Sequence, residues 1–427
     1  MSASTGRPAS SLAAVTDLLG LRPRATGAPS RPSARRLGVI AGRSGPRFLV
    51  PLDDPAATPE ACLAYLGLRD ARTRATRGAV GLALKARLGR FVVHEELEAD
   101  AGPGSLIALL QEHLADPEHP DELAVAVGLG TQDEVWKPTL QVFRPDGTPA
   151  AFVKVGLGPV ADRLVGTEAE TLAAWGLHPD PRLVVPHLLA DTTWEGTRIA
   201  VVAPLPEDAR RLPAGQAVSA WPVRELDGPL RSGPIATAPW WTGRLAACAD
   251  HGRVAPLLDV VTERHADVDP EALAWARWHG DWVPWNLARC HRGLIAWDWE
   301  YAEPDAPVGL DEVHGAYQQA RVVEGRSVAD ALAVARSAAG RLVATGTSPT
   351  SPAALRSQAA TPAPAHHRTD PGAAPAQERP EARWLADAHV AMLATRSAEL
   401  ERLLGRPPAD QLELLAAADA ALAETAP

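Results

Sequence analysis

The chain has 427 residues, of which 46% are hydrophobic and 22% are charged, and its formal net charge at pH 7 is −10. The acidic balance argues against a nucleic-acid partner, because affinity for nucleic acids depends on lysine and arginine neutralising phosphates. The sequence contains no uninterrupted apolar run of about 18 residues, so we predict no membrane span. Three cysteines without metal-ligand spacing, Cys62, Cys248 and Cys290, argue against a disulfide framework and favour a reducing, cytoplasmic location.

The first 120 residues precede the recognisable motifs. Residues 1–46 are rich in Ser, Ala, Pro and Arg and lack a secretory pattern, so we predict a disordered tail in which residues 12–21 form a short helix at most. Residues 47–120 read first as a strand and then as helices, with amphipathic stretches at 82–88 and 105–114. We expect them to form an N-terminal extension that packs on the next lobe; a separate binding domain is the alternative.

A group of short strands follows within residues 121–206. Residues 123–127 read as a strand that ends at Gly128 and Gly130, whose backbone amides can approach a phosphate, although two glycines in a hairpin are more often only a turn. Further strands are predicted at 139–143 and 150–155, and the second of these carries a single lysine, Lys154. Alone, Lys154 is as readily explained as a strand-edge lysine that deters aggregation.

A helix and a further strand complete this region. The residues around 167–175 have helical spacing with Thr167 as N-cap, and this helix carries Glu168 as the preferred partner for a lysine and Glu170 as the fallback. The apolar strand 198–206 ends in Ala203-Pro-Leu205-Pro, an edge that can offer backbone groups to a purine.

The most informative motif runs from His279 to Asn286. It contains Asp281 and Asn286 five residues apart in a run that Pro284 prevents from being a regular helix. A short strand at 294–297 then delivers Asp298, followed by Glu300. A carboxylate that accepts a proton from an attacking hydroxyl, and an amide and a second carboxylate that hold magnesium, are the groups that phosphoryl transfer from a nucleotide requires.

These residues resemble the aminoglycoside phosphotransferase and choline kinase superfamily, in which H-G-D-x-x-x-x-N forms the catalytic loop and D-x-[DE] holds magnesium. The Trp-Asp-Trp-Glu run is also similar to uncharacterised actinobacterial phosphotransferase-like proteins. The resemblance implies an α+β, bilobal protein-kinase-like fold, with a small antiparallel-sheet N-lobe, a mainly helical C-lobe and here an N-terminal extension. It also implies Mg2+ as cofactor and ATP or GTP as phosphoryl donor.

The resemblance implies a role for individual residues of this sequence. Asp281 corresponds to the catalytic base and His279 to a residue that braces the loop, while Lys154, paired with Glu168, corresponds to the phosphate-binding lysine. The remaining candidates are the metal ligands Asn286, Asp298 and Glu300, the nucleotide-binding residues Gly128, Gly130, Ala203 and Leu205, and the substrate-stacking residues Trp282 and Trp285. Four acidic residues, Glu303, Asp305, Asp311 and Glu312, are further candidates for an aminated substrate, although surface placement explains them equally well.

The C-terminal part divides by composition. We assign residues 207–344 to the helical C-lobe with the catalytic and metal loops, 345–383 to a disordered Ala/Pro-rich insertion, and 384–427 to the last C-lobe helices. The predicted function is phosphorylation of a hydroxyl group on a small molecule. A nucleotide-binding regulatory protein without turnover, a pseudokinase, is the alternative.

Overall fold

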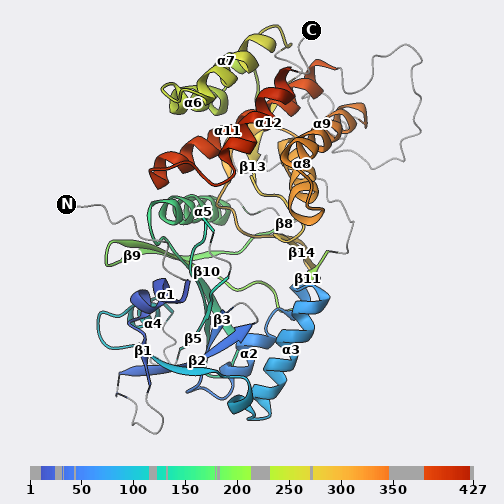
Figure 1. Cartoon of the computed structure of the whole chain (residues 1–427). Helices are drawn as coiled ribbons and strands as arrows, with labels where there is room; N and C mark the ends of the chain where they lie inside the picture. The colour runs from blue at the N-terminus through green and yellow to red at the C-terminus, as the bar shows by residue number, and fades with distance from the viewer. Residues whose placement is uncertain are drawn as a thin grey trace, which may run out of the picture. The chain divides into compact units, whose positions relative to one another are not determined.

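The computed structural model describes residues 11–24, 31, 33–42, 45–114, 123–130, 133–177, 179, 183–212, 231–269, 273–345 and 379–423. The chain divides into two compact units (Figure 1). Unit 1 comprises Met1–Gly176, Arg182–Arg211 and Ala288–Ile295; unit 2 comprises Leu177–Pro181, Leu212–Leu287 and Ala296–Pro427.

Unit 1 is built on a nine-stranded sheet whose assigned strand pairs are all antiparallel. Its order is β1-β4-β2-β3-β5-β6-β7-β10-β9. The strands are β1 (Arg22–Pro23), β2 (Ala34–Gly42), β3 (Gly45–Pro51), β4 (Glu95–Asp100), β5 (Ala124–Gly128), β6 (Thr139–Phe143), β7 (Pro149–Val155), β9 (Leu188–Trp194) and β10 (Thr197–Val202).

Helix α1 (Ser11–Leu19) forms close to the short helix expected at residues 12–21. The predicted disordered tail is wrong at residues 34–42, where strand β2 pairs with both β3 and β4. The cause is a short apolar run, Leu37 to Ile40, in which Leu37, Val39 and Ile40 become buried. Burial of these side chains stabilises β2. The composition averaged over residues 1–46 conceals this short apolar run.

Helices cover both faces of this sheet. Alternation along β5 sends Val125 and Val127 into a core with α1 and α4 (Leu106–Leu114), whereas Ala124 and Ala126 face the core formed with α2 (Ala57–Leu63) and α3 (Ala71–Lys85). Figure 1 shows α2 and α3, in blue, beside the strands of the extension. The extension is therefore part of the same sheet and the same cores, and the alternative of a separate domain does not hold.

Helix α5 (Pro159–Leu177) carries the predicted glutamate. It begins eight residues earlier than expected, so Thr167 lies inside the helix and the predicted N-cap is wrong. A smaller sheet completes unit 1, with the strand order β11-β14-β15-β8. Its strands are β8 (Leu183–Val184), β11 (Arg210–Arg211), β14 (Leu287–Cys290) and β15 (Gly293–Ala296).

Unit 2 is mainly helical, with one three-stranded antiparallel sheet of order β12-β13-β16. The strands are β12 (Arg231–Ser232), β13 (Ala274–Trp278) and β16 (Glu303–Pro307), and the helices are α6 (Pro239–Cys248), α7 (Val254–Arg264), α8 (Leu310–Gln318), α9 (Val328–Thr345), α11 (Pro380–Leu404) and α12 (Gln411–Ala423). Its core contains Trp241, Trp275 and Trp384, and Trp384 meets the other two indoles edge-on.

The element order confirms the predicted fold class. A lysine-bearing strand, a glutamate-bearing helix and a further strand lie in the antiparallel-sheet unit, and the motif loops lie in the mainly helical unit, which is the kinase-like order. The predicted insertion at 345–383 lies outside the described residues except for its ends. Among the residues that the structure describes, no helix is long and apolar enough to span a membrane.

Candidate active site

Lys154 and Glu168 form the ion pair that the sequence predicted. The ammonium group of Lys154 lies 2.6 Å from Oε1 and 2.5 Å from Oε2 of Glu168. Both side chains are buried, with relative exposures of 7% and 1%. Glu170, the fallback partner, is exposed and instead lies near Arg198, so the helix register resolves the choice in favour of Glu168.

The two glycines of the predicted phosphate turn differ in their surroundings. Gly128 is the last residue of β5 and pairs with Thr139 on one side and Phe48 on the other. Gly130 lies beyond the strand with a φ of 57°, a left-handed conformation that glycine adopts without strain. The rest of the predicted turn, residues 131 and 132, lies outside the described residues.

The segment after β10 lines a cavity of about 530 Å3. Ala203 and Leu205, the predicted purine-binding residues, both border it, together with His187 and the hairpin residues His291 and Arg292. No residue of β5, β6 or β7 lines this cavity.

The loop from His279 to Asn286 is held by hydrogen bonds within unit 2. The side-chain amide of Asn286 donates to the backbone oxygen of Asp281 (3.1 Å) and to Oδ2 of the same residue (2.8 Å). The ring of His279 is fully buried; its Nδ1 accepts from the amide of Asp281 (3.2 Å), and its Nε2 lies 3.0 Å from the oxygen of Trp297. The acidic residue and the amide that the motif separates by five positions thus lie side by side.

Gly280 explains why the motif needs glycine between His279 and Asp281. Its φ is 83°, and a Cβ placed on it would clash with the backbone oxygen and carbon of Tyr301. The close approach allows Arg396 of α11 to donate to the oxygens of both Gly280 (3.0 Å) and Tyr301 (3.4 Å).

Asp311, at the start of α8, anchors the same loop through its carboxylate. Its two carboxylate oxygens accept from the amides of His279 (2.8 Å) and Gly280 (2.9 Å). Burial raises the pKa of Asp311 to about 6, against the opposing effect of these two hydrogen bonds. The suggestion that Asp311 binds an aminated substrate is therefore not supported, because its carboxylate is buried and committed to the backbone.

The surroundings of Asp281 favour its protonated form. Burial raises the pKa of this carboxyl and nearby Asp298 adds to the effect, while His279, Arg396 and the Asn286 hydrogen bond act in the opposite direction. A base with a raised pKa is a stronger proton acceptor than an ordinary aspartate.

Two buried histidines lie beside Asp281, and the sequence analysis did not identify them. Nε2 of His314 is 3.7 Å from Oδ1 of Asp281, and its Nδ1 is 3.2 Å from Nε2 of His389. Burial lowers the pKa of both rings, so they are neutral at pH 7. Both histidines are distant from the motif in sequence, and only folding of the chain brings them close to Asp281.

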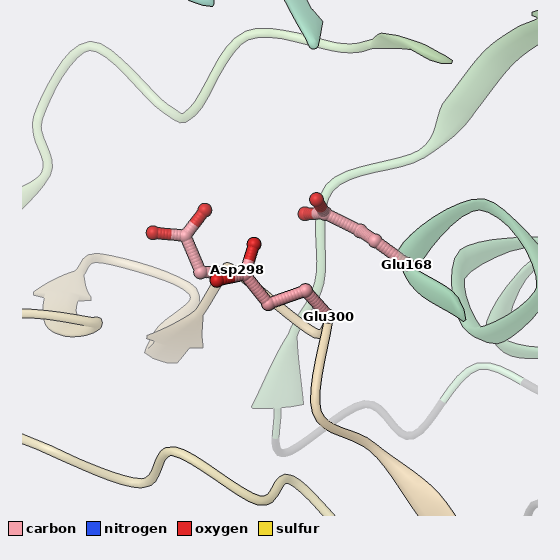
Figure 2. A group of neighbouring side chains, drawn as sticks. All are labelled: Glu168, Asp298 and Glu300. Atoms are coloured by element: carbon pink, nitrogen blue, oxygen red, sulfur yellow. The ribbon is translucent and has the colours of Figure 1, made fainter. Parts of the chain in front are cut away.

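Asp298 and Glu300 follow β15 on one stretch of chain, as Figure 2 shows. They can present carboxylate oxygens within 4.8 Å of each other. Asp298 has a φ of 60°, a left-handed conformation that aspartate adopts more readily than most residues. Oxygen donors from Asp298, Glu300 and Asn286 form the kind of set that magnesium prefers. Glu168, also labelled in Figure 2, belongs to α5 of unit 1.

The two candidate tryptophans have different environments. Trp282 is only 3% exposed and meets the ring of His279 edge-on at 5.6 Å, so it serves the core of the loop and offers little surface for stacking. Trp285 is half-buried and stays a candidate. Of the other acidic candidates, Glu303 forms a two-pronged ion pair with Arg244, and Asp305 pairs with Arg231.

Comparisons with known proteins give distant likenesses only. No protein-family model matches the chain, and a search of curated proteins found no match. Among solved structures, the chain is similar to a thermostable mutant of an aminoglycoside phosphotransferase in complex with AMP-PNP and hygromycin B, at 14% identity over 72% of this chain and 91% of that chain, with a TM-score of 0.36.

Two further structures have comparable scores. A macrolide 2′-phosphotransferase from Brachybacterium faecium is 15% identical over 74% of this chain and 96% of that chain, with a TM-score of 0.34. A spectinomycin phosphotransferase in complex with ADP and spectinomycin is 10% identical over 70% and 88%, with a TM-score of 0.33. At these scores the likenesses do not define the function of this chain, and a closer relationship to actinobacterial proteins stays a prediction.

Proposed function

We propose that the chain is an O-phosphotransferase that moves the terminal phosphoryl group of ATP or GTP to a hydroxyl group of a small molecule, such as a sugar, an aminoglycoside-like compound or an amino alcohol. The observation that carries the proposal is the hydrogen-bonded unit of Asp281 and Asn286, joined through Trp297 to Asp298. It brings together a base and two metal ligands on a loop that is supported from several sides.

Within this proposal Asp281 orients the acceptor hydroxyl and accepts its proton, a role that its raised pKa favours. Asn286 and Asp298 would hold Mg2+, with Glu300 as a further ligand. Because the amide nitrogen of Asn286 donates to Asp281, its carbonyl oxygen is the atom suited to a metal. Magnesium would supply neutralisation of phosphate charge.

Unit 1 would supply the nucleotide-binding groups. The ion pair with Glu168 fixes the ammonium of Lys154, as required of a lysine that binds phosphate oxygens. Gly128 and Gly130 would add backbone amides, and the backbone of Ala203 and Leu205 would contact the base. The three free cysteines support a cytoplasmic location for such an enzyme.

Transfer of label is the direct test. The full chain would be incubated with Mg2+, a library of hydroxylated metabolites, and ATP or GTP labelled in the terminal phosphate. We expect a labelled small molecule whose formation stops when EDTA removes the metal and in the Asp281→Asn variant. Absence of labelled product with every acceptor class, from a protein that binds nucleotide, would favour the alternative of a regulatory protein without turnover.

One observation supports that alternative. The hydroxyl of Tyr65, in the N-terminal extension, donates to the backbone oxygen of Leu205, a group assigned here to the nucleotide base. The two hypotheses therefore differ in whether this contact opens.

A further inference from the structure

One face of the large sheet carries Lys154 and Gly128, two of the residues proposed to bind the nucleotide. Side chains alternate along β7, so Phe152 and Lys154 point to the same face. Strand pairing sets Gln141 opposite Phe152 and Thr139 opposite Lys154, and Gly128 lies opposite Thr139. These five positions form one continuous surface, which we call the lysine face.

Part of the N-terminal extension lies on the lysine face. A cavity of about 180 Å3 is lined on one side by sheet residues that include Gly128, Thr139, Gln141 and Phe152, and on the other by Ala61, Arg69 and Arg77. The last three belong to residues 61–77, which we call the cover segment. All these residues are in unit 1, and the cover segment is fully described.

Tyr65 makes the most specific contacts of the cover segment. Its hydroxyl donates to the backbone oxygen of Leu205 at 2.9 Å. Its ring lies 5.6 Å from the ring of Phe152, tilted by 44°. Burial raises the pKa of the Tyr65 hydroxyl, which keeps it protonated as a donor.

The backbone at Tyr65 is in an uncommon conformation. Its φ of 57° and ψ of 28° place an aromatic residue in the left-handed region, which is unfavourable for a bulky side chain. Contacts of the side chain with Leu205 and Phe152 offset that cost. Release of Tyr65 when a ligand replaces those contacts would relieve this strain.

Further contacts hold the cover segment at Gly67 and between its two ends. Gly67 lies against Ala209 and Arg210, so closely that a Cβ would come within 2.8 Å of the oxygen of Ala209. Arg77 donates to the oxygen of Ala61 at 2.7 Å, and its guanidinium lies over the ring of Phe48. The segment is therefore a defined part of the fold and not a loose loop.

We propose that the cover segment is an autoinhibitory strap, in which Tyr65 occupies the place of the nucleotide base. The inference rests on the proposed function. A purine amine and ring would use the same backbone acceptor at Leu205 and the same aromatic surface of Phe152 that the hydroxyl and ring of Tyr65 use. Nucleotide and Tyr65 therefore exclude each other, and the strap must leave Leu205 before the base binds.

Competition of this kind reduces the apparent affinity for nucleotide by the fraction of molecules in which the strap is open. The test is the dissociation constant for Mg–AMP-PNP and Mg–GMP-PNP, measured by calorimetry on the full chain. We expect Tyr65→Ala to bind about 10-fold tighter than wild type, because ring and hydroxyl contacts are both lost. Tyr65→Phe, which loses only the hydroxyl, should gain about 3-fold. Phe91→Ala is the matched control, since Phe91 is an exposed aromatic side chain of the same extension.

Hydrogen exchange gives a second measurement that needs no variant. In the wild-type chain, saturating nucleotide should increase amide exchange within residues 61–77 and leave residues 106–114 of α4 unchanged. Equal affinity of Tyr65→Ala and wild type, or protection of the cover segment by nucleotide, would overturn the strap while leaving the nucleotide site in place. If neither wild type nor Tyr65→Ala bound nucleotide, the proposed function would fail and the strap with it.

Discussion

The backbone amide of Trp297 donates to the backbone oxygen of Asn286 at 3.2 Å. This bond joins the end of the loop from His279 to Asn286 to the residue that precedes Asp298. Since Nε2 of His279 also lies 3.0 Å from the oxygen of Trp297, both ends of the loop contact one residue. The carboxylates of Asp281 and Asp298 are thereby held on a common backbone framework, and the first prediction follows from this.

Asp281→Asn and Asp298→Ala should each reduce phosphoryl transfer by about 10³-fold or more, since each removes a group to which the proposed function gives a central role. Melting temperatures should stay within a few degrees of wild type. Asp259→Asn, at an exposed aspartate of α7, is the control and should transfer at the wild-type rate. Near-normal turnover in either site variant would remove that residue from the mechanism.

The buried ion pair of unit 1 should show strong coupling. Lys154→Met or Glu168→Gln alone leaves a charged or polar partner buried and should lower the free energy of unfolding by about 3–5 kcal/mol. The double variant removes both charges and should recover about 2 kcal/mol or more in urea unfolding, while nucleotide affinity stays low. Asp191→Asn, which breaks the more exposed pair with Arg198, should cost less than about 1 kcal/mol. Strictly additive losses at residues 154 and 168 would contradict the coupling.

Gly280→Ala tests the close approach to Tyr301. The added methyl group would clash with the Tyr301 backbone, and the φ of 83° disfavours any side chain. We expect a loss of about 3 kcal/mol or more in thermal or urea unfolding, together with loss of transfer activity. Gly243→Ala, on the exposed side of α6 with no atom within 4 Å of the new Cβ, should be neutral or slightly stabilising. A stable, active Gly280→Ala variant would show that the two segments are not in contact in solution.

Asp311 should make stability depend on pH. Its pKa rises from 3.8 to about 6 on burial, so the folded state holds this proton more tightly than the unfolded state. The contribution of Asp311 is therefore most favourable below about pH 4 and declines as the pH rises to about 6.

The measurement compares the wild type with Asp311→Asn. The free energy of unfolding of wild type minus variant should fall by about 2–3 kcal/mol between about pH 4 and pH 6.5, and should be constant above that. A difference that increases with pH over the same interval would mean that the two backbone donors outweigh the effect of burial.

The sequence predicted those parts of the fold in which local pattern and tertiary packing agree. The strand at 139–143 follows from its local pattern, and the strand that carries Lys154 follows from a single lysine in an apolar run. The pairing of Lys154 with Glu168 was expected from the family resemblance, and the structure contains it. Strand β2 was missed because its apolar run is short and surrounded by residues typical of disorder. Its stability comes from pairing with β3 and β4, and such pairing cannot be read from the residues of β2 alone.

The candidate site was predictable in its motif residues and not in their supports. Asp281, Asn286 and Asp298 stand close together in the chain and have diagnostic chemistry. Arg396 and His389 lie about a hundred residues away, on α11, where they look like ordinary polar residues of a long helix. Only helix packing in unit 2 brings Arg396 to the oxygen of Gly280 and His389 to His314.

Strand β3 has a consequence for any shortened form of this chain. It joins the extension to the rest of the sheet by pairing Phe48 and Leu49 with Gly128 and Val127 of β5. A protein that started near residue 121 would expose the unpaired donors and acceptors along β5, next to an uncovered apolar surface. Such an edge can pair with strands of other molecules, so the first hundred residues also protect the chain from self-association.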